Sequence, residues 1–220
     1  MIVIATHNGK TVLQDLLSDL RNIKCTVPIS VIDTGSSDEL CLSYLKELCE
    51  TFPQLNINVY STPEKNWDTG AYMFAIKHLK ANKYYFLQDS IRILRQDIFD
   101  VIDDLLQPKT VVAFSYFPGK TDAWFHKFGR ALCRKNFNSL DYDVGIFGPM
   151  FCILREDIDR CWDTLPKFLP TSKHEACGME RGWGIFCKLN NLKIVSLTQR
   201  SILQGEEQHS FYKKIFKKRK

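Results

Sequence analysis

The feature that most constrains the fold is a regular alternation of short hydrophobic runs with longer amphipathic runs. Five runs are almost continuously apolar, which is typical of strands buried on both faces: Ile2–Ala5, Ile29–Asp33, Ile57–Tyr60, Tyr84–Leu87 and Val111–Phe114. Between them, apolar residues recur at intervals of three and four, which predicts helices near Val12–Ile23, Cys41–Phe52, Thr69–Leu79 and Ile98–Leu106. This alternation predicts an α/β fold with a mostly parallel central sheet flanked by helices.

The pattern weakens in the second half of the chain. Gly119–Gly145 is irregular and rich in aromatic and basic residues, so no helix or strand is predicted there. A strand is predicted within Phe147–Leu154, followed by a helix with apolar residues from Ile158 to Leu165. A chain of 220 residues with this organisation fits a single domain.

The net charge of +5 is concentrated at one end of the chain. Phe211–Lys220 holds six basic residues and no acid, and removing those six charges leaves −1 for residues 1–210. We therefore expect a nearly neutral body and a basic tail at 211–220. The tail is a candidate contact to a membrane surface, and nucleic acid is not an expected partner.

Localisation follows from the apolar runs and the cysteines. No run approaches the roughly 18 to 20 apolar residues that span a bilayer, and Met1–Asn8 lacks the features of a signal peptide. The eight cysteines form no Cys-x-x-Cys pair and lie mostly in apolar stretches, which favours reduced thiols over disulfides or a zinc site. These features predict a cytoplasmic protein, peripheral at a membrane surface if the tail binds there.

Polar residues follow four of the predicted strands, at the edge where ligands of parallel sheets bind. These residues are His7 and Asn8, Asp33, Asn66–Asp68 and Gln88–Ser90. The sequence lacks the phosphate-binding motif of P-loop NTPases, the Gly-x-Gly-x-x-Gly of dinucleotide-binding proteins and the Gly-x-Ser-x-Gly of hydrolases. The expected site therefore belongs to another class of α/β protein.

Four segments in one order carry a resemblance to a known family: Val3–Asn8, Val31–Asp38, Asn66–Ala71 and Tyr85–Ser90. Together they resemble the nucleotide-sugar domain of GT-A glycosyltransferases, especially the family-two-like group, over about residues 2–200. The resemblance implies a Rossmann-like GT-A domain at 1–210, with a nucleotide-sugar half at 1–117 and an acceptor half at 118–210. It also implies transfer of a sugar from a nucleoside-diphosphate sugar, with a UDP-sugar expected, to a hydroxyl of a glycan, lipid-linked or protein acceptor.

The resemblance assigns donor binding to residues at the strand ends. Thr6 and Asn8 lie where the first strand meets the nucleotide, and Asp33 matches the acid that binds the uracil or ribose. Asp68 and Gly70 match the loop that approaches the sugar diphosphate, where a glycine allows close backbone contact. The alternatives are local. Asp33 would support the next helix, which Asp38 caps better, and Asp68 or Thr69 would simply start a helix.

Gln88–Ser90 falls where the family carries its Asp-x-Asp motif, which holds Mn²⁺ or Mg²⁺ against the diphosphate. Only Asp89 is acidic here, so Asp89 is the expected metal ligand and Gln88 a donor-binding residue. The weakened motif leaves metal dependence open. His209 matches the late histidine that often serves as a further metal ligand, with an ordinary surface histidine as the alternative.

The acceptor side is expected in His174–Gly184, which is predicted to precede a helix at Ile185–Leu189. The segment resembles the family's acid motif and implies that Glu180 is the base of an inverting transfer, with Glu175 in reserve. Trp183 is expected to stack on an acceptor sugar. The alternative for Glu180 is a local cap or an ion pair with Arg181.

Two other functions were weighed. A sugar-phosphate nucleotidyltransferase shares the broad fold, but Thr6–Lys10 lacks the Gly-rich, Arg- and Lys-containing signature of that class. A non-catalytic nucleotide- or polyanion-binding module is compatible with the weakened acidic motif.

Overall fold

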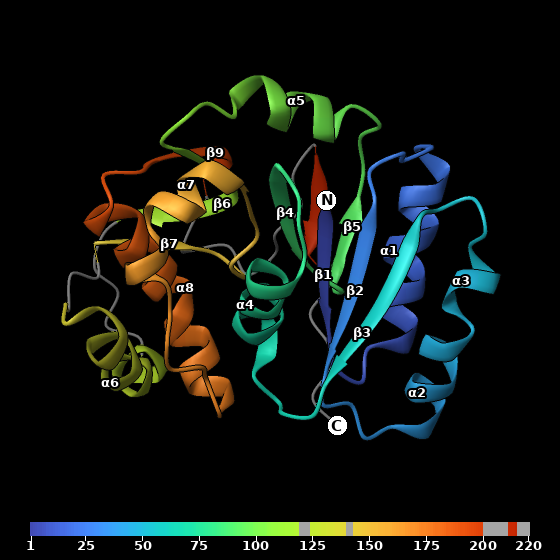
Figure 1. Cartoon of the computed structure of the whole chain (residues 1–220), viewed down its shortest axis with the longest axis horizontal. Coiled ribbons are helices and arrows are strands. Elements are labelled where there is room, and N and C mark those ends of the chain that lie inside the picture. The colour runs from blue at the N-terminus through green and yellow to red at the C-terminus, as the bar shows by residue number, and fades with distance from the viewer. Residues whose placement is uncertain (119–123, 140–142, 200–210, 215–220) are drawn as a thin grey trace.

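The computed structural model describes residues 1–118, 124–139, 143–199 and 211–214. In this part of the chain, the central sheet has eight strands, and seven of them follow the order β3-β2-β1-β4-β8-β6-β7 (Figure 1). The strands are β1 (Ile2–Thr6), β2 (Ile29–Thr34), β3 (Ile57–Thr62), β4 (Lys83–Gln88), β6 (Thr110–Pro118), β7 (Val144–Ile146), β8 (Phe151–Leu154) and β9 (Lys193–Gln199).

The direction of pairing changes across the sheet. Strands β3, β2, β1 and β4 are parallel neighbours. Strand β8 runs antiparallel between β4 and β6, and β7 pairs antiparallel with β6 further along the same strand. Strand β9 pairs with β6 in parallel. The predicted α/β fold with a mostly parallel sheet is therefore confirmed, and among the described strands of this central sheet the antiparallel pairs are those made by β7 and β8.

Helices cover both faces of the sheet because alternate strand residues point to opposite sides. Ile2 and Ile4 of β1 belong to one apolar cluster, whereas Val3 and Ala5 belong to the other. The first cluster is covered by α1 (Lys10–Asn22), α2 (Glu39–Lys46), α3 (Leu48–Thr51) and α5 (Ile98–Leu105). The second is covered by α4 (Trp67–His78), α6 (Trp124–Phe137), α7 (Arg155–Arg160) and α8 (Lys173–Leu189). Figure 1 shows α1–α3 on one side of the sheet and α4, α6 and α8 on the other.

A second, two-stranded sheet ties the chain's last described segment into the core. Strand β5 (Ile91–Ile93) pairs antiparallel with β10 (Tyr212–Lys214), and the Leu94 N–H donates to the Phe211 carbonyl over 2.9 Å. Tyr212 is fully buried, with its ring 5.4 Å from that of Phe114. The prediction of a detached basic tail from residue 211 is therefore wrong for 211–214. Residues 215–220 lie outside the described residues.

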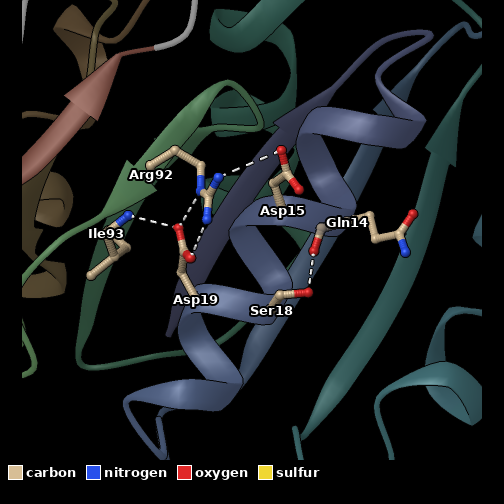
Figure 2. A network of polar contacts seen from close by, with 6 residues as sticks. All are labelled: Gln14, Asp15, Ser18, Asp19, Arg92 and Ile93. Carbon is tan, nitrogen blue, oxygen red and sulfur yellow. Dashed lines mark hydrogen bonds and ion pairs between the residues drawn. The ribbon is translucent and has the colours of Figure 1, made fainter.

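A polar network fixes β5 to the first helix (Figure 2). The Arg92 guanidinium donates to both carboxylate oxygens of Asp19, over 2.6 and 2.7 Å, and lies 3.6 Å from Asp15. The Ile93 backbone N–H donates to the same Asp19 carboxylate over 3.0 Å. Bidentate geometry of this kind is specific as well as strong, so β5 has one defined position on α1.

Two helices differ from the sequence prediction. Helix α6 lies in the segment for which no element was predicted, because its buried residues Leu132, Cys133 and Phe137 are interspersed with basic residues. Helix α8 begins at Lys173 rather than near Ile185, with Ser172 as its N-cap. Its glycines allow neighbouring backbone to approach. A Cβ at Gly178 would lie 2.3 Å from the Gly129 Cα, and a Cβ at Gly184 would lie 2.3 Å from the Val144 carbonyl oxygen.

All eight cysteines are free thiols, as the sequence indicated. Burial raises the pKa of the Cys152 and Cys187 thiols well above the ordinary value, so both are held in the neutral form. Among the described residues, no helix is both long and apolar enough to cross a membrane.

Candidate active site

Asp89 is the most tightly positioned acid at the carboxyl edge of the sheet. It follows β4, its backbone N–H donates to the Ala5 carbonyl over 3.0 Å, and its side chain is 4% exposed. Thr6, at the end of β1, donates its hydroxyl to Asp89 Oδ2 over 2.8 Å. Gly9 is required beside them, because a Cβ there would lie 2.0 Å from the same oxygen. Two neighbouring strand ends and the start of α1 therefore fix this carboxylate.

Asp68 and Gln88 meet beside this carboxylate, although twenty residues separate them. Gln88 Nε2 donates to Asp68 Oδ2, and Asp68 Oδ1 accepts the Thr69 N–H over 2.7 Å. Gly148 has a positive φ of 57°, and a Cβ there would lie 3.0 Å from Gln88 Oε1. The first turn of α4 is thus joined to the end of β4, as the order of the strand-end motifs suggested.

Asn8 and Asp33 are joined through one serine. The Asn8 N–H donates to Ser36 Oγ over 2.8 Å, and the Ser36 hydroxyl and N–H donate to Asp33. The Asn8 side chain accepts from the Ser37 and Asp38 N–H groups, each over 2.9 Å. Asp38 caps α2 by accepting from the Cys41 N–H over 2.8 Å, which confirms it as the N-cap. The Asp33 side chain, which is 2% exposed, therefore stabilises the turn after β2 through its hydrogen bonds with Ser36.

Two predicted site residues have structural explanations instead. Gly70 is buried inside the first turns of α4, where a Cβ would lie 2.3 Å from the Asn66 Cβ. The absence of a side chain at Gly70 lets the helix pack closely against Asn66, and the Gly70 backbone is buried rather than exposed to a ligand. Trp183 is 1% exposed, its ring lies 5.0 Å from that of Phe151, and its Nε1–H donates to Thr69 Oγ1 over 3.3 Å. No ring face is open, so its burial contradicts stacking on an acceptor sugar.

The two candidate bases occupy different parts of α8. Glu175 accepts from the Thr171 N–H and hydroxyl over 2.7 and 2.9 Å, so it stabilises the start of the helix. Glu180 is partly exposed and lies one turn before Trp183. Because residues three apart share a helix face, Glu180 projects from the side of α8 that contacts Thr69 of α4. His209 lies outside the described residues.

The charge around Asp89 bears on metal binding. Burial and the negative charges of Asp68 and Asp89 raise the pKa of the Tyr72 phenol well above its ordinary value. Within the described residues, the buried Tyr72 hydroxyl has no hydrogen-bond partner, and no three His, Cys, Asp or Glu side chains are grouped as a metal site. One carboxylate with hydroxyl and amide oxygens nearby fits Mg²⁺ or Mn²⁺ when substrate phosphates complete the coordination, because both ions prefer oxygen ligands.

Sequence reasoning missed two lysines beside this edge, Lys65 and Lys173. The Trp67 ring has the ammonium groups of Lys65 and Lys173 4.7 and 5.0 Å from its centroid, and the His7 ring lies 6.2 Å away. His7 Nδ1 is 2.9 Å from the Thr34 carbonyl oxygen. No local pattern predicts that Lys173, at the start of α8, meets Trp67, at the start of α4.

The fixed acids lie at the carboxyl ends of the parallel strands, which is where open α/β sheets bind their ligands. A family model described as "Glycosyl transferase family 2" matches residues 1–162. The chain therefore belongs to glycosyl transferase family 2.

Solved structures agree on the fold. The mannosyltransferase PcManGT from Pyrobaculum calidifontis, in complex with GDP-Man and Mn²⁺, is 14% identical with a TM-score of 0.57, over 89% of this chain and 53% of that one. TarS 1–349 from S. aureus is 15% identical with a TM-score of 0.56, over 97% of this chain and 59% of that one. The same TarS fragment in complex with UDP has a TM-score of 0.54 at 14% identity, over 96% of this chain and 58% of that one. This chain thus spans little more than half the length of these relatives. The comparison with curated proteins finds no match.

Proposed function

We propose that this domain transfers a sugar from a nucleoside-diphosphate sugar to an acceptor hydroxyl, with a UDP-sugar as the expected donor. The observation that carries the proposal is the position of the Asp89 carboxylate at the edge where the parallel strands end. Thr6 donates a hydrogen bond to this carboxylate, and Gly9 leaves room for it. Membership of glycosyl transferase family 2 supports the reaction class. The structural relatives are described as complexes with GDP-Man or UDP, which supports a nucleotide donor.

The proposed donor site extends over the strand ends. Asn8 and Asp33 would contact the nucleoside. Asp33 already accepts hydrogen bonds from the N–H and the hydroxyl of Ser36, so its side chain has little freedom to move. Asp68 and Gln88 lie beside the diphosphate, and Asp89 would hold Mn²⁺ or Mg²⁺. When bound, the cation neutralises charge that develops on the leaving nucleoside diphosphate.

Glu180 is the proposed base. It would accept the proton of the acceptor hydroxyl while that oxygen attacks the anomeric carbon opposite the leaving diphosphate, which inverts the configuration. The position of Glu180 on the face of α8 toward α4 supports this role. A Glu180→Gln variant should bind donor normally and lose turnover at least a hundredfold, because general base catalysis contributes factors of about 10² to 10⁴.

Titration calorimetry with UDP and GDP, with and without Mn²⁺, tests the donor site. Asp89→Asn keeps an acceptor for the Thr6 hydroxyl but removes the charge, so Mn²⁺-dependent binding should fall at least tenfold. Asp104→Asn, an exposed acid on α5, is the matched control and should bind as the wild type does. Absence of binding to either nucleotide in the wild type, or unchanged binding in Asp89→Asn, would refute the proposal. Binding without hydrolysis or transfer of any donor would favour a binding module.

A further inference from the structure

Two lysines from distant parts of the chain converge on one tryptophan. Lys65 lies in the loop before α4 and Lys173 is the first residue of α8, and their ammonium groups are 4.7 and 5.0 Å from the centroid of the Trp67 ring. In the described part of the chain, neither ammonium has an acidic partner within ion-pair distance. Each ammonium is attracted to the face of the ring, and a bound anion would offset the repulsion between the two like charges.

Trp67 itself carries two unusual features. Its φ is +56°, a conformation that a bulky side chain rarely adopts. Its indole Nε1–H is buried and, among the described residues, has no hydrogen-bond partner. Strained backbone and unsatisfied buried donors persist mainly where function requires them. A ligand oxygen that reaches this N–H as the lysine side chains rearrange would satisfy it.

Two helix N-termini add to the positive potential at this place. The N-cap of α4, Asn66, makes no capping bond, because its side-chain amide donates to Glu64 over 3.0 Å instead. Helix α8 begins with Lys173 itself, and Figure 1 shows both helices starting near the same edge of the sheet. The N-terminal ends of helix dipoles favour anions.

A groove of about 530 Å³ lies beside the loop before α4 and the start of α8, and Lys65, Trp67 and Lys173 are not among the residues that line it. Glu64 and Asn66 line it on either side of Lys65 in the sequence, and Thr171 and Glu175 line it on either side of Lys173. Its wall also carries Lys135 and Lys167 and the ring of Phe168, which is 40% exposed with the Lys135 ammonium 3.8 Å from its centroid.

The lining of the groove holds two lysines, Lys135 and Lys167, and two acids, Glu64 and Glu175. Both acids are already engaged, Glu64 with Asn66 and Glu175 with Thr171. Lys65 and Lys173, which are close in sequence to these lining residues, add positive charge beside the groove. An open groove with ammonium groups and a partly exposed aromatic ring suits a carbohydrate that carries a phosphate.

We propose that Lys65, Lys173 and the Trp67 indole N–H bind a phosphate group of the acceptor, and that the groove holds the adjoining sugar. The inference rests on the proposed function, because it assigns the acceptor of that transfer to the class of phosphate-bearing carbohydrates. The groove is walled by α6, α8, the segment before α8 and, through Glu64 and Asn66, the loop before α4. Trp67 also immediately precedes Asp68 of the proposed donor site, so titrations with glucose 6-phosphate and with UDP are needed to distinguish an acceptor phosphate from the donor diphosphate.

Titration calorimetry at constant ionic strength tests the site, with glucose 6-phosphate and glucose as probes. The wild type should bind glucose 6-phosphate at least tenfold more tightly than glucose. The double variant Lys65→Ala/Lys173→Ala should lose that preference, and Trp67→Phe, which keeps the ring and removes the N–H, should lose part of it. Lys46→Ala/Lys77→Ala removes two exposed lysines elsewhere and should leave it unchanged. Thermal unfolding of each variant confirms that it is folded.

Titration with UDP and Mn²⁺ separates the two phosphate sources. The affinity for UDP should stay within twofold in Lys65→Ala/Lys173→Ala. An equal loss of UDP and glucose 6-phosphate binding would overturn the inference, because the lysines would then serve the donor diphosphate. Equal binding of glucose and glucose 6-phosphate by the wild type would also overturn it. Lysine-dependent binding of glucose 6-phosphate without any nucleotide binding would support the phosphate site and refute the proposed transferase function.

Discussion

The contact between α6 and α8 predicts that the same substitution at two glycines of α8 destabilises the protein at one position and is nearly neutral at the other. In Gly178→Ala, the new Cβ would lie 2.3 Å from the Gly129 Cα and 3.1 Å from its carbonyl carbon. Ordinary contact begins at 3.4 Å, so the two helix backbones must separate by about 1 Å. Overpacking against backbone destabilises by about 1–3 kcal/mol, and replacing a helical glycine by alanine returns about 1 kcal/mol. We therefore expect a net loss of up to about 2 kcal/mol, at the upper end because the contact is with backbone that cannot move aside.

Gly182→Ala is the matched control. Its Cβ would lie 2.9 Å from the Sδ and Cε atoms of Met179 and 3.3 Å from a ring atom of Phe137. The Met179 side chain is flexible and can move aside, so the gain in helix propensity should offset the crowding to within about 0.5 kcal/mol.

Thermal unfolding followed by circular dichroism measures both variants. For a domain of this size, 1 kcal/mol corresponds to a shift of about 2–4 °C in the melting temperature. Gly178→Ala should therefore melt several degrees below Gly182→Ala. If Gly178→Ala were as stable as Gly182→Ala, the two helix backbones would not be in the close contact described, and the explanation of the glycines in α8 would fail.

Three further predictions concern the core and its polar contacts. Tyr212→Ala should cost about 3–5 kcal/mol in the free energy of unfolding, because the ring is fully buried against Phe114; a loss below 1 kcal/mol would mean that β10 is not part of the core. Burial raises the pKa of Tyr44 from 10.0 to about 12, so stability should fall as pH rises from 10 to 12, where only the unfolded chain has lost this proton. Tyr44→Phe should weaken that fall in pH-dependent unfolding, and an identical pH profile would refute the assignment. Asp19→Ala should destabilise by about 2 kcal/mol in urea unfolding, because it leaves the Arg92 guanidinium without its bidentate partner; an effect no larger than that of an exposed acid would contradict the network.

The sequence predicted the parts of the fold that continuous apolar runs define. Strands β1 to β4 and β6 were located to within a few residues, because strands buried on both faces are almost uninterrupted in hydrophobicity. Short strands such as β5 and β10 escaped prediction, since three residues carry no measurable period. Helix α6 was missed because basic residues interrupt its apolar face, and the start of α8 was missed because its glycines are explained only by contacts with other elements.

The part of the site that lies at the ends of predicted strands could be predicted, and the part that depends on helix packing could not. Thr6, Asp68, Gln88 and Asp89 come together because each follows or precedes a predicted strand or helix at one edge of the sheet. The convergence of Lys65 and Lys173 on Trp67 depends instead on how α8 packs against α4. The burial of Trp183 depends on the same packing, so an exposed aromatic could not be distinguished from a core aromatic by residue type alone.

The pairing of β10 with β5 has a consequence for the order in which the protein can fold during synthesis. The apolar face around Phe114 is complete only when Tyr212 is in place, close to the last residue described. Until that residue leaves the ribosome, the nascent chain must keep this face uncovered, and β5 lacks a partner strand. Contacts between such distant residues form late and slow folding, and exposed strand edges promote aggregation. The synthesis of β10 thus determines when this part of the domain can leave the aggregation-prone stage of its folding.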